Sequence, residues 1–175
     1  VTLRSSAHGP VASHDPPRRP ATALASIAMQ PGGAGSFAMI AINLAKDWNS
    51  LRKAFPLHPS PTNFHYADVD GNTGWQVIGF APVRKQGDGL LPLPGDGRYD
   101  WTGMRNFATM PSDYNPAKGW FASANQNNLP ADTPRDRIPA FSFRDPYRYE
   151  RIADVLASQS RHGIADSVAL QYDTL

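Results

Sequence analysis

The dipeptide Asp70-Gly71 is the feature that most constrains the fold of this chain. It lies in the middle of residues 63–79, where apolar and polar residues alternate on both sides of it. Alternation of this kind places successive side chains on opposite faces of a strand. Asp-Gly supplies the positive φ angles that a tight hairpin turn needs. The segment therefore predicts a β-hairpin that reverses at Asp70-Gly71.

Proline and glycine limit the rest of the chain to short elements. There are 17 Pro and 14 Gly in 175 residues, so turns and extended connections must be frequent and long helices rare. The hydrophobic content of 41% is enough for one domain with a core of its own. We therefore expect a loop-rich α+β fold.

Short apolar runs between loops predict further strands. They lie at residues 1–4, 9–12, 21–29 and 120–125, with extended or turn segments at 91–95 and 100–103. His8-Gly9-Pro10 forms the corner between the first two runs, where Gly9 permits a close backbone approach.

Helical spacing of apolar residues appears in two regions. Residues 36–55 predict two helices separated near 44–47 and stopped by Pro56. Residues 149–157 and 164–172 predict two more, with Gly163 between them.

Several classes of function are disfavoured by composition. The formal net charge is +2 and the basic residues are scattered in pairs, so we expect no nucleic-acid partner. No apolar run reaches the length that spans a bilayer, so we expect no membrane insertion. The chain has no Cys, which removes disulfides and thiolate nucleophiles, and its histidines lack the spacing of zinc ligands.

One nucleophilic site is suggested near the start of the chain and then argued against. Ser5, Ser6, His8 and Asp15 hold the residue types of a Ser-His-Asp triad. They lack the strand-to-helix elbow that presents a nucleophilic serine. A turn at His8-Gly9-Pro10 is the better interpretation.

The order of several short motifs resembles the penicillin acylase family of N-terminal-nucleophile amide hydrolases. These motifs are Tyr66-Ala67-Asp68-Val69-Asp70-Gly71-Asn72, Gly87-Asp88-Gly89 leading into Leu93-Pro94-Gly95, Trp101-Thr102-Gly103, the run 119–125 that ends at Asn125, and Arg148. Each alone is an ordinary turn or loop, and the specificity of the resemblance comes from their order.

The resemblance implies an αββα sandwich cut from a precursor, with an N-terminal Ser as the nucleophile of the β chain. Residues 1–175 would be an internal fragment of the β-chain domain, because Val1 is not an initiating Met and the last residues leave a helix abruptly. The nucleophile-bearing part and the remaining C-terminal part would lie outside it, so this chain alone should be inactive.

Two residues match the active site of the resembling family. Asn125 would donate its side-chain amide to the oxyanion of the tetrahedral intermediate. Arg148 would orient that amide and keep the nearby amine less protonated by repulsion between like charges. Without the resemblance, Asn125 would be a turn residue and Arg148 a surface cation, and Asn127 is an alternative donor.

The resemblance also implies an activity, partners and a location. The substrate would be an N-acyl small molecule such as a penicillin or an acyl-homoserine lactone, cleaved at a linear amide bond. An α chain from the same precursor would be the partner, in the periplasm or outside the cell. The chemistry would need no cofactor. Members of the family often hold a structural calcium, and Asp132 or Asp136 lies near the place of one of its ligands, whereas the other ligands would lie outside this sequence.

Two other interpretations stay open. The chain can belong to a non-catalytic relative that keeps the fold for binding or structure. It can also be a stand-alone β-rich interaction module unrelated to acylases, which would fold cooperatively by itself.

Overall fold

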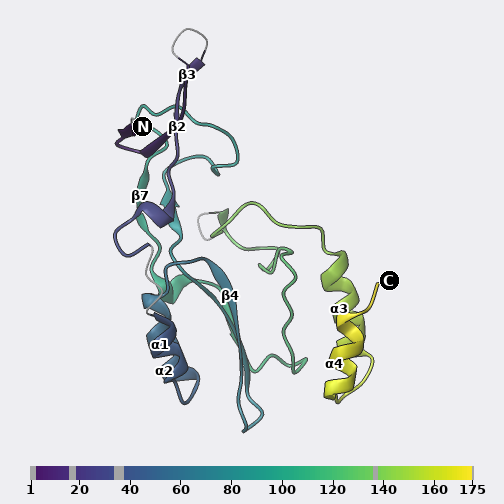
Figure 1. Ribbon diagram of the computed structural model, residues 1–175. Coiled ribbons are helices and arrows are strands. Elements are labelled where there is room, and N and C mark those ends of the chain that lie inside the picture. The colour runs from purple at the N-terminus through teal and green to yellow at the C-terminus, as the bar shows by residue number, and fades with distance from the viewer. Residues whose placement is uncertain (1–2, 16–18, 34–37, 136–137, 175) are drawn as a thin grey trace.

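The computed structural model describes residues 3–15, 19–33, 38–135 and 138–174. Its short strands and first two helices form one part of the molecule, and a pair of helices near the C-terminus forms another (Figure 1). Chain without regular structure joins the two parts. In the described residues, no helix combines the length and apolar character that crossing a membrane requires.

The predicted hairpin is confirmed. Strand β4 (Thr62–Ala67) pairs antiparallel with β5 (Thr73–Ile78), in a register that runs from Thr62 opposite Ile78 to Ala67 opposite Thr73. Strand β8 (Ser112–Tyr114) pairs antiparallel with the other edge of β5. β5 is therefore the central strand of this sheet.

The turn of the hairpin differs from the tight reversal predicted at Asp70-Gly71. Residues 68–72 form a longer loop, in which Gly71 has a φ of +85° but Asp70 does not adopt a positive φ. The Asp68 carboxylate accepts backbone N–H bonds from Asp70 at 3.0 Å and Asn72 at 2.9 Å, and the Tyr66 hydroxyl at 2.7 Å. The Asp68 carboxylate thus holds the loop together, whereas the sequence predicted a tight turn made by Asp70-Gly71 alone.

The two faces of the hairpin bury different partners. On one face, Phe64, Tyr66 and Ile78 pack with helices α1 (Ala38–Asn43) and α2 (Trp48–Ala54). Asn63, His65, Trp75 and Val77 alternate with these residues and so lie on the opposite face. The sheet therefore separates a hydrophobic core from the region described below as the candidate site.

Helices α1 and α2 confirm the two helices predicted within residues 36–55. The break between them is set by Asp47, whose carboxylate accepts the backbone N–H of Ser50 at 2.7 Å and caps α2. A 3-10 turn, η2 (Phe55–Leu57), follows at Pro56. Phe55 is completely buried at the centre of the core, where its ring contacts Phe64 and Phe107.

The N-terminal strands are shifted from the predicted positions. Strand β1 (Ser5–Ser6) follows rather than occupies residues 1–4, of which 1–2 lie outside the described residues. β2 (Gly9–Asp15) confirms the strand predicted at 9–12. β3 (Arg19–Ala23) ends early, because Ser26 caps a 3-10 turn, η1 (Ile27–Met29), within the run predicted as a strand.

Gly9 makes the close backbone approach that the sequence predicts. Its φ is +123°, and a Cβ at this position would lie 2.3 Å from the carbonyl oxygen of Leu24. Only glycine fits this corner without displacing the backbone at Leu24.

The remaining elements frame the centre of the chain. β6 (Pro82–Arg84) pairs with β7 (Trp101–Met104), and the 3-10 turn η3 (Phe107–Thr109) precedes β8. Helices α3 (Tyr147–Ala157) and α4 (Ile164–Gln171) confirm the predicted C-terminal pair. Arg151 of α3 holds Asp173 beyond α4 through a contact of 2.6 Å.

The Tyr66–Asp68 pair gives the hairpin a pH dependence. The hydrogen bond to Asp68 raises the pKa of Tyr66 to about 12. The pKa of Tyr66 in the folded chain is higher than its ordinary value of about 10. The hydrogen bond therefore stabilises the folded chain fully below about pH 10, and this stabilisation is lost as the pH rises toward the folded pKa. We expect Asp68→Asn to move the Tyr66 pKa back toward about 10, measured as the difference in tyrosinate absorbance between each protein and its Tyr66→Phe partner. An unchanged titration in Asp68→Asn would contradict this origin of the shift.

Candidate active site

Asn125 has an unusual backbone conformation. Its φ is +71°, a left-handed conformation that among the described non-glycine residues is shared only by Asn115. Asparagine tolerates this region better than most side chains. The residues before and after it, Ala124 and Gln126, are both 7% exposed, whereas Asn125 itself is exposed. The conformation therefore turns the Asn125 side chain outward from a buried segment.

Arg148 of α3 fixes the direction of the Asn125 side chain. Its Nη2 donates to the backbone oxygen of Ala124 at 2.6 Å and to Oδ1 of Asn125 at 2.8 Å. A guanidinium only donates, so the oxygen of the Asn125 amide must face it. The amide nitrogen points away and has no hydrogen-bond partner among the described residues. Arg148 thus leaves a fixed and unused N–H donor at Asn125.

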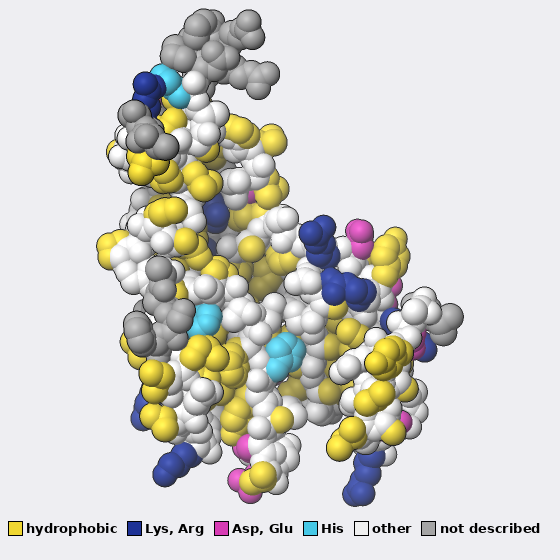
Figure 2. Space-filling model, viewed as in Figure 1, with side chains coloured by type: hydrophobic (Ala, Val, Ile, Leu, Met, Phe, Trp, Pro, Cys, Tyr) yellow, Lys and Arg dark blue, Asp and Glu magenta, His cyan; other side chains and the backbone are white. Residues whose placement is uncertain are grey.

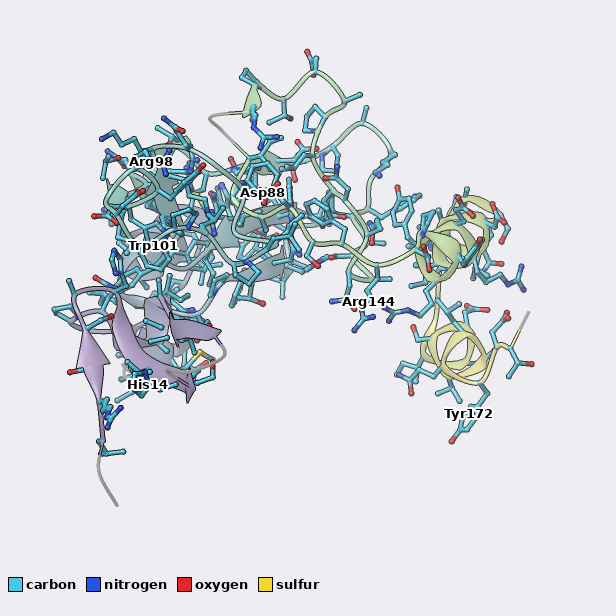
Figure 3. The ribbon with its side chains drawn as sticks, turned by 90° about the horizontal axis from the view of Figure 1, so that it is seen from above. His14, Asp88, Arg98, Trp101, Arg144 and Tyr172 are labelled. Carbon is cyan, nitrogen blue, oxygen red and sulfur yellow. The ribbon has the colours of Figure 1, made fainter. Side chains whose placement is uncertain are left out.

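Asn125 lies on the wall of a cavity of about 540 Å³. Aromatic side chains make up much of this wall: Trp75, Phe80, Trp101, Phe141 and Phe143. Figure 2 shows hydrophobic side chains inside the hollow between the two parts of the molecule, with Lys and Arg side chains on its edge near α3. Figure 3 shows Arg144 on the chain that leads to α3, with Trp101 and Asp88 on the strand-bearing side. Such a cavity suits an apolar group next to a few polar contacts.

A polar network supports the segment that carries Asn125. Trp75 of β5 donates its indole N–H to Oδ1 of Asn63 at 2.8 Å, and Nδ2 of Asn63 donates to the Ser123 hydroxyl at 3.1 Å. Phe121 stacks on Trp75 with ring centroids 4.4 Å apart. The segment around Asn125 is therefore anchored to the face of the sheet that points away from the core.

Four basic residues that are scattered in the sequence line a second cleft of about 280 Å³: Arg84, Lys85, Arg105 and Arg135. Burial lowers the pKa of Arg84, and repulsion from Arg105 acts in the same direction while Asp88 opposes it. Asp88 lies 3.9 Å from Arg135. The sequence does not reveal this cluster, because the β6–β7 pairing brings Arg84 and Lys85 near Arg105 and irregular chain far along the sequence adds Arg135.

Comparison with known proteins identifies the family. The sequence model of the family described as penicillin amidase matches residues 1–175. The chain belongs to the penicillin amidase family. Acyl-homoserine lactone acylase QuiP of Pseudomonas syringae pv. tomato is 35% identical over 168 residues, which are 86% of this chain and 20% of that protein. Penicillin G acylase of Escherichia coli is 36% identical over 119 residues, which are 67% of this chain and 14% of that protein.

The fold of a family member confirms the expected fold class. A structure of thermostable penicillin G acylase from Alcaligenes faecalis superposes with a TM-score of 0.81 at 22% sequence identity, covering 97% of this chain and 30% of that one. The α+β, loop-rich fold of N-terminal-nucleophile hydrolases is thus the fold of this chain. The chain spans about a fifth of the length of the QuiP relative, 20%.

The two predicted site residues of this penicillin amidase domain come together, but not on a strand. Residues 120–125 were predicted as a strand, and that prediction is wrong, because the run pairs with no strand among the described residues and ends in a left-handed conformation at Asn125. The alternative donor Asn127 accepts the backbone N–H of Leu129 at 3.0 Å and is not on the cavity wall. Its side chain closes a local turn.

The other sequence-based candidates lie elsewhere. His8 pairs with Asp100 at 2.9 Å, and the Ser6 hydroxyl bonds to Gly9, so the structure gives His8 a different partner from the one in the rejected triad. Asp132 is exposed, and Asp136 lies outside the described residues. Among the residues with a described position, no three or more His, Asp or Glu side chains gather as a metal site would require.

Proposed function

We propose that this chain is part of an amide hydrolase that removes the acyl group from an N-acyl small molecule. The observation that carries the proposal is the Asn125 side chain, held through its oxygen by Arg148 and facing a cavity of about 540 Å³ with a free N–H donor. An amide hydrolase needs such a donor for the oxyanion that forms when a nucleophile attacks the carbonyl. Family membership and the acylase relatives support the same reaction.

The nucleophile comes from outside this chain in the proposed mechanism. The serines on the cavity wall, Ser26 and Ser142, have no His or Lys beside them on the described wall that would accept a proton. An N-terminal Ser supplies both groups, since its hydroxyl attacks and its α-amine, with an ordinary pKa of about 8, takes the proton. Asn125 then stabilises the negative oxygen, and Arg148 holds Asn125 in place.

The substrate proposed is an N-acyl compound with an apolar acyl group. The aromatic wall formed by residues such as Trp75, Trp101 and Phe143 favours an apolar chain or ring over a charged one. Both a penicillin and an acyl-homoserine lactone meet this description. The relatives carry both activities in their names, acyl-homoserine lactone acylase and penicillin G acylase.

We also propose that residues 1–175 are an internal part of a β-chain domain that pairs with an α chain from the same precursor, in the periplasm or outside the cell. The accessible surface of this chain is 12500 Å² at 19.1 kDa. A compact monomer of that mass exposes about 8,400 Å² by the usual scaling with mass. The excess supports further polypeptide packing against this chain.

The first test uses the product of the complete reading frame. We expect two chains, the larger beginning with Ser and containing this segment, and hydrolysis of an N-acyl 4-nitroanilide. Asn125→Ala should lower kcat about 100- to 1000-fold with little change in KM, because the donor acts on the transition state. Steady-state kinetics on mature protein, quantified by mass spectrometry, measure both constants.

Asn127→Ala is the matched control, because Asn127 neighbours Asn125 but is not on the cavity wall. Its kinetics should equal those of the unmodified protein. A single uncleaved chain without an N-terminal Ser would instead favour a non-catalytic relative of the same fold. Equal losses in Asn125→Ala and Asn127→Ala would remove the special role of Asn125.

A pair of Arg148 variants separates its two proposed roles. Arg148→Lys keeps the positive charge but loses the planar group that reaches Ala124 and Asn125 together. It should lower kcat and leave the acidic limb of the pH–rate profile in place. Arg148→Gln also removes the charge, so the nearby α-amine should gain a higher pKa and the acidic limb should move to higher pH.

Rate measurements on the mature protein across the acidic range, at constant ionic strength, give both readouts. If the acidic limb of the pH–rate profile lies at the same pH in Arg148→Gln and Arg148→Lys, the electrostatic role is ruled out. Only the orientation of Asn125 then remains as the role of Arg148.

A further inference from the structure

Gln126 is a buried polar side chain directly behind the proposed oxyanion donor. Only 7% of it is exposed, and among the described residues the one other buried side chain that is polar or charged is Gln76. Burying a side-chain amide is costly unless its donors and acceptor are bonded. The sequence gives no sign of this burial, since Gln126 stands between two asparagines in a polar run.

The oxygen and both N–H groups of the Gln126 side-chain amide form hydrogen bonds within the protein. Its Oε1 accepts the backbone N–H of Ala124 at 2.7 Å. Its Nε2 donates to the backbone oxygen of Ala122 at 3.4 Å and to Oδ1 of Asn128. Both hydrogens of Nε2 are therefore used within the protein, and Gln126 has none left to donate to a substrate.

These bonds replace the strand that the sequence predicted at residues 120–125. A strand satisfies its backbone groups with a neighbouring strand. Here the Gln126 side chain does so instead, by bonding the main chain at Ala122 and Ala124. The segment is thus held in an irregular conformation by a side chain of its own.

The peptide groups around Asn125 are held from several sides. Gln126 holds the N–H of Ala124, and Arg148 holds the C=O of Ala124 at 2.6 Å. The C=O of Asn125 accepts the N–H of Arg144 at 2.8 Å. Arg148 and Arg144 thus hold the two peptide groups that flank Asn125, and Gln126 holds the peptide group before them, so these contacts together support its φ of +71°.

The same side chain connects the segment to the sheet. Asn128, which accepts from Gln126, donates to the Ser123 hydroxyl at 3.0 Å and to Oδ1 of Asn63 at 3.3 Å. Oδ1 of Asn63 also accepts the indole N–H of Trp75 on β5. A functional group is placed more accurately when its support reaches a regular element.

We infer that Gln126 is a positioning residue that sets the oxyanion donor Asn125, an inference that rests on the function proposed above. Gln126 lines the same cavity as Asn125, but its amide is used in bonds within the protein, so we place its action in the backbone of residues 122–126. Its loss should displace the Asn125 amide without removing it. A displacement on the order of 1 Å at a catalytic group lowers the rate about 100-fold.

A double-mutant cycle on the mature protein tests this inference. Gln126→Met keeps the length of the side chain and removes its hydrogen bonds. We expect kcat to fall about 10- to 100-fold with KM changed less than about threefold, because the oxyanion forms only in the transition state. In the Asn125→Ala background the same change should alter kcat less than about twofold, since the group that it positions is absent.

The outcome that overturns the inference is an equal fall of kcat in both backgrounds, which would mean that Gln126 supports the fold alone. Asn127→Ala is again the matched control. If Gln126→Met yields no mature protein, Asn128→Ala replaces it, because it removes one acceptor of Nε2 and leaves Gln126 in place. Its effect on kcat should be severalfold and should likewise vanish with Asn125→Ala.

The cycle also separates this inference from the proposed function. Loss of hydrolysis in Asn125→Ala with normal kinetics in Gln126→Met and Asn128→Ala would keep the function and reject the role of Gln126. Unchanged hydrolysis in Asn125→Ala would reject the proposed function itself.

Discussion

The pairing of β5 with strands on both of its edges is the constraint on which the rest of the structure depends. Its residues alternate between two buried environments, so its register with β4 decides what each face meets. Ile78 enters the hydrophobic core, and Gly74 allows the Trp48 ring to lie against the strand, where a Cβ would be 2.9 Å from it. Trp75 faces the other way and holds the candidate site. A slip by one residue would exchange the two faces.

The site uses this support to keep one strained residue in place. A left-handed Asn125 would relax toward an ordinary conformation if its neighbouring peptide groups were free. Arg148 and Arg144 each hold one of those groups, and Gln126 holds the N–H of Ala124 in the peptide group that comes before them. They come from helix α3, from the chain before it and from the segment itself. The position of the donor therefore depends on contacts from α3 and from the chain before it as well as on the segment itself.

Periodicity in the sequence predicted the elements whose partners are close in the chain. The β4–β5 hairpin and all four α-helices were found because alternation or helical spacing reports burial directly. The strand expected at 120–125 was wrong because the run packs on the face of the sheet, where Phe121 stacks on Trp75, and does not pair with a strand edge among the described residues. The resemblance to the family supplied Asn125 and Arg148. No periodic pattern indicated the network of Gln126 and Asn63, in which Gln126 bonds residues within four positions and Asn63 bonds Ser123, 60 positions away.

The orientation of Asn125 and its exposure to water have different consequences for the proposed chemistry. Asn125 and Arg148 are already hydrogen-bonded to each other in this chain, so in the proposed reaction the donor would need no reorganisation. Both residues are nevertheless exposed in this chain. A hydrogen bond to a developing negative charge is strong only where water is excluded, because water screens charge and competes for the donor. In the proposed enzyme, the polypeptide that brings the nucleophile must also cover Asn125. Assembly would then deliver the attacking group and the low-dielectric surroundings together, and a donor already fixed by Arg148 and Gln126 would become effective only at that point.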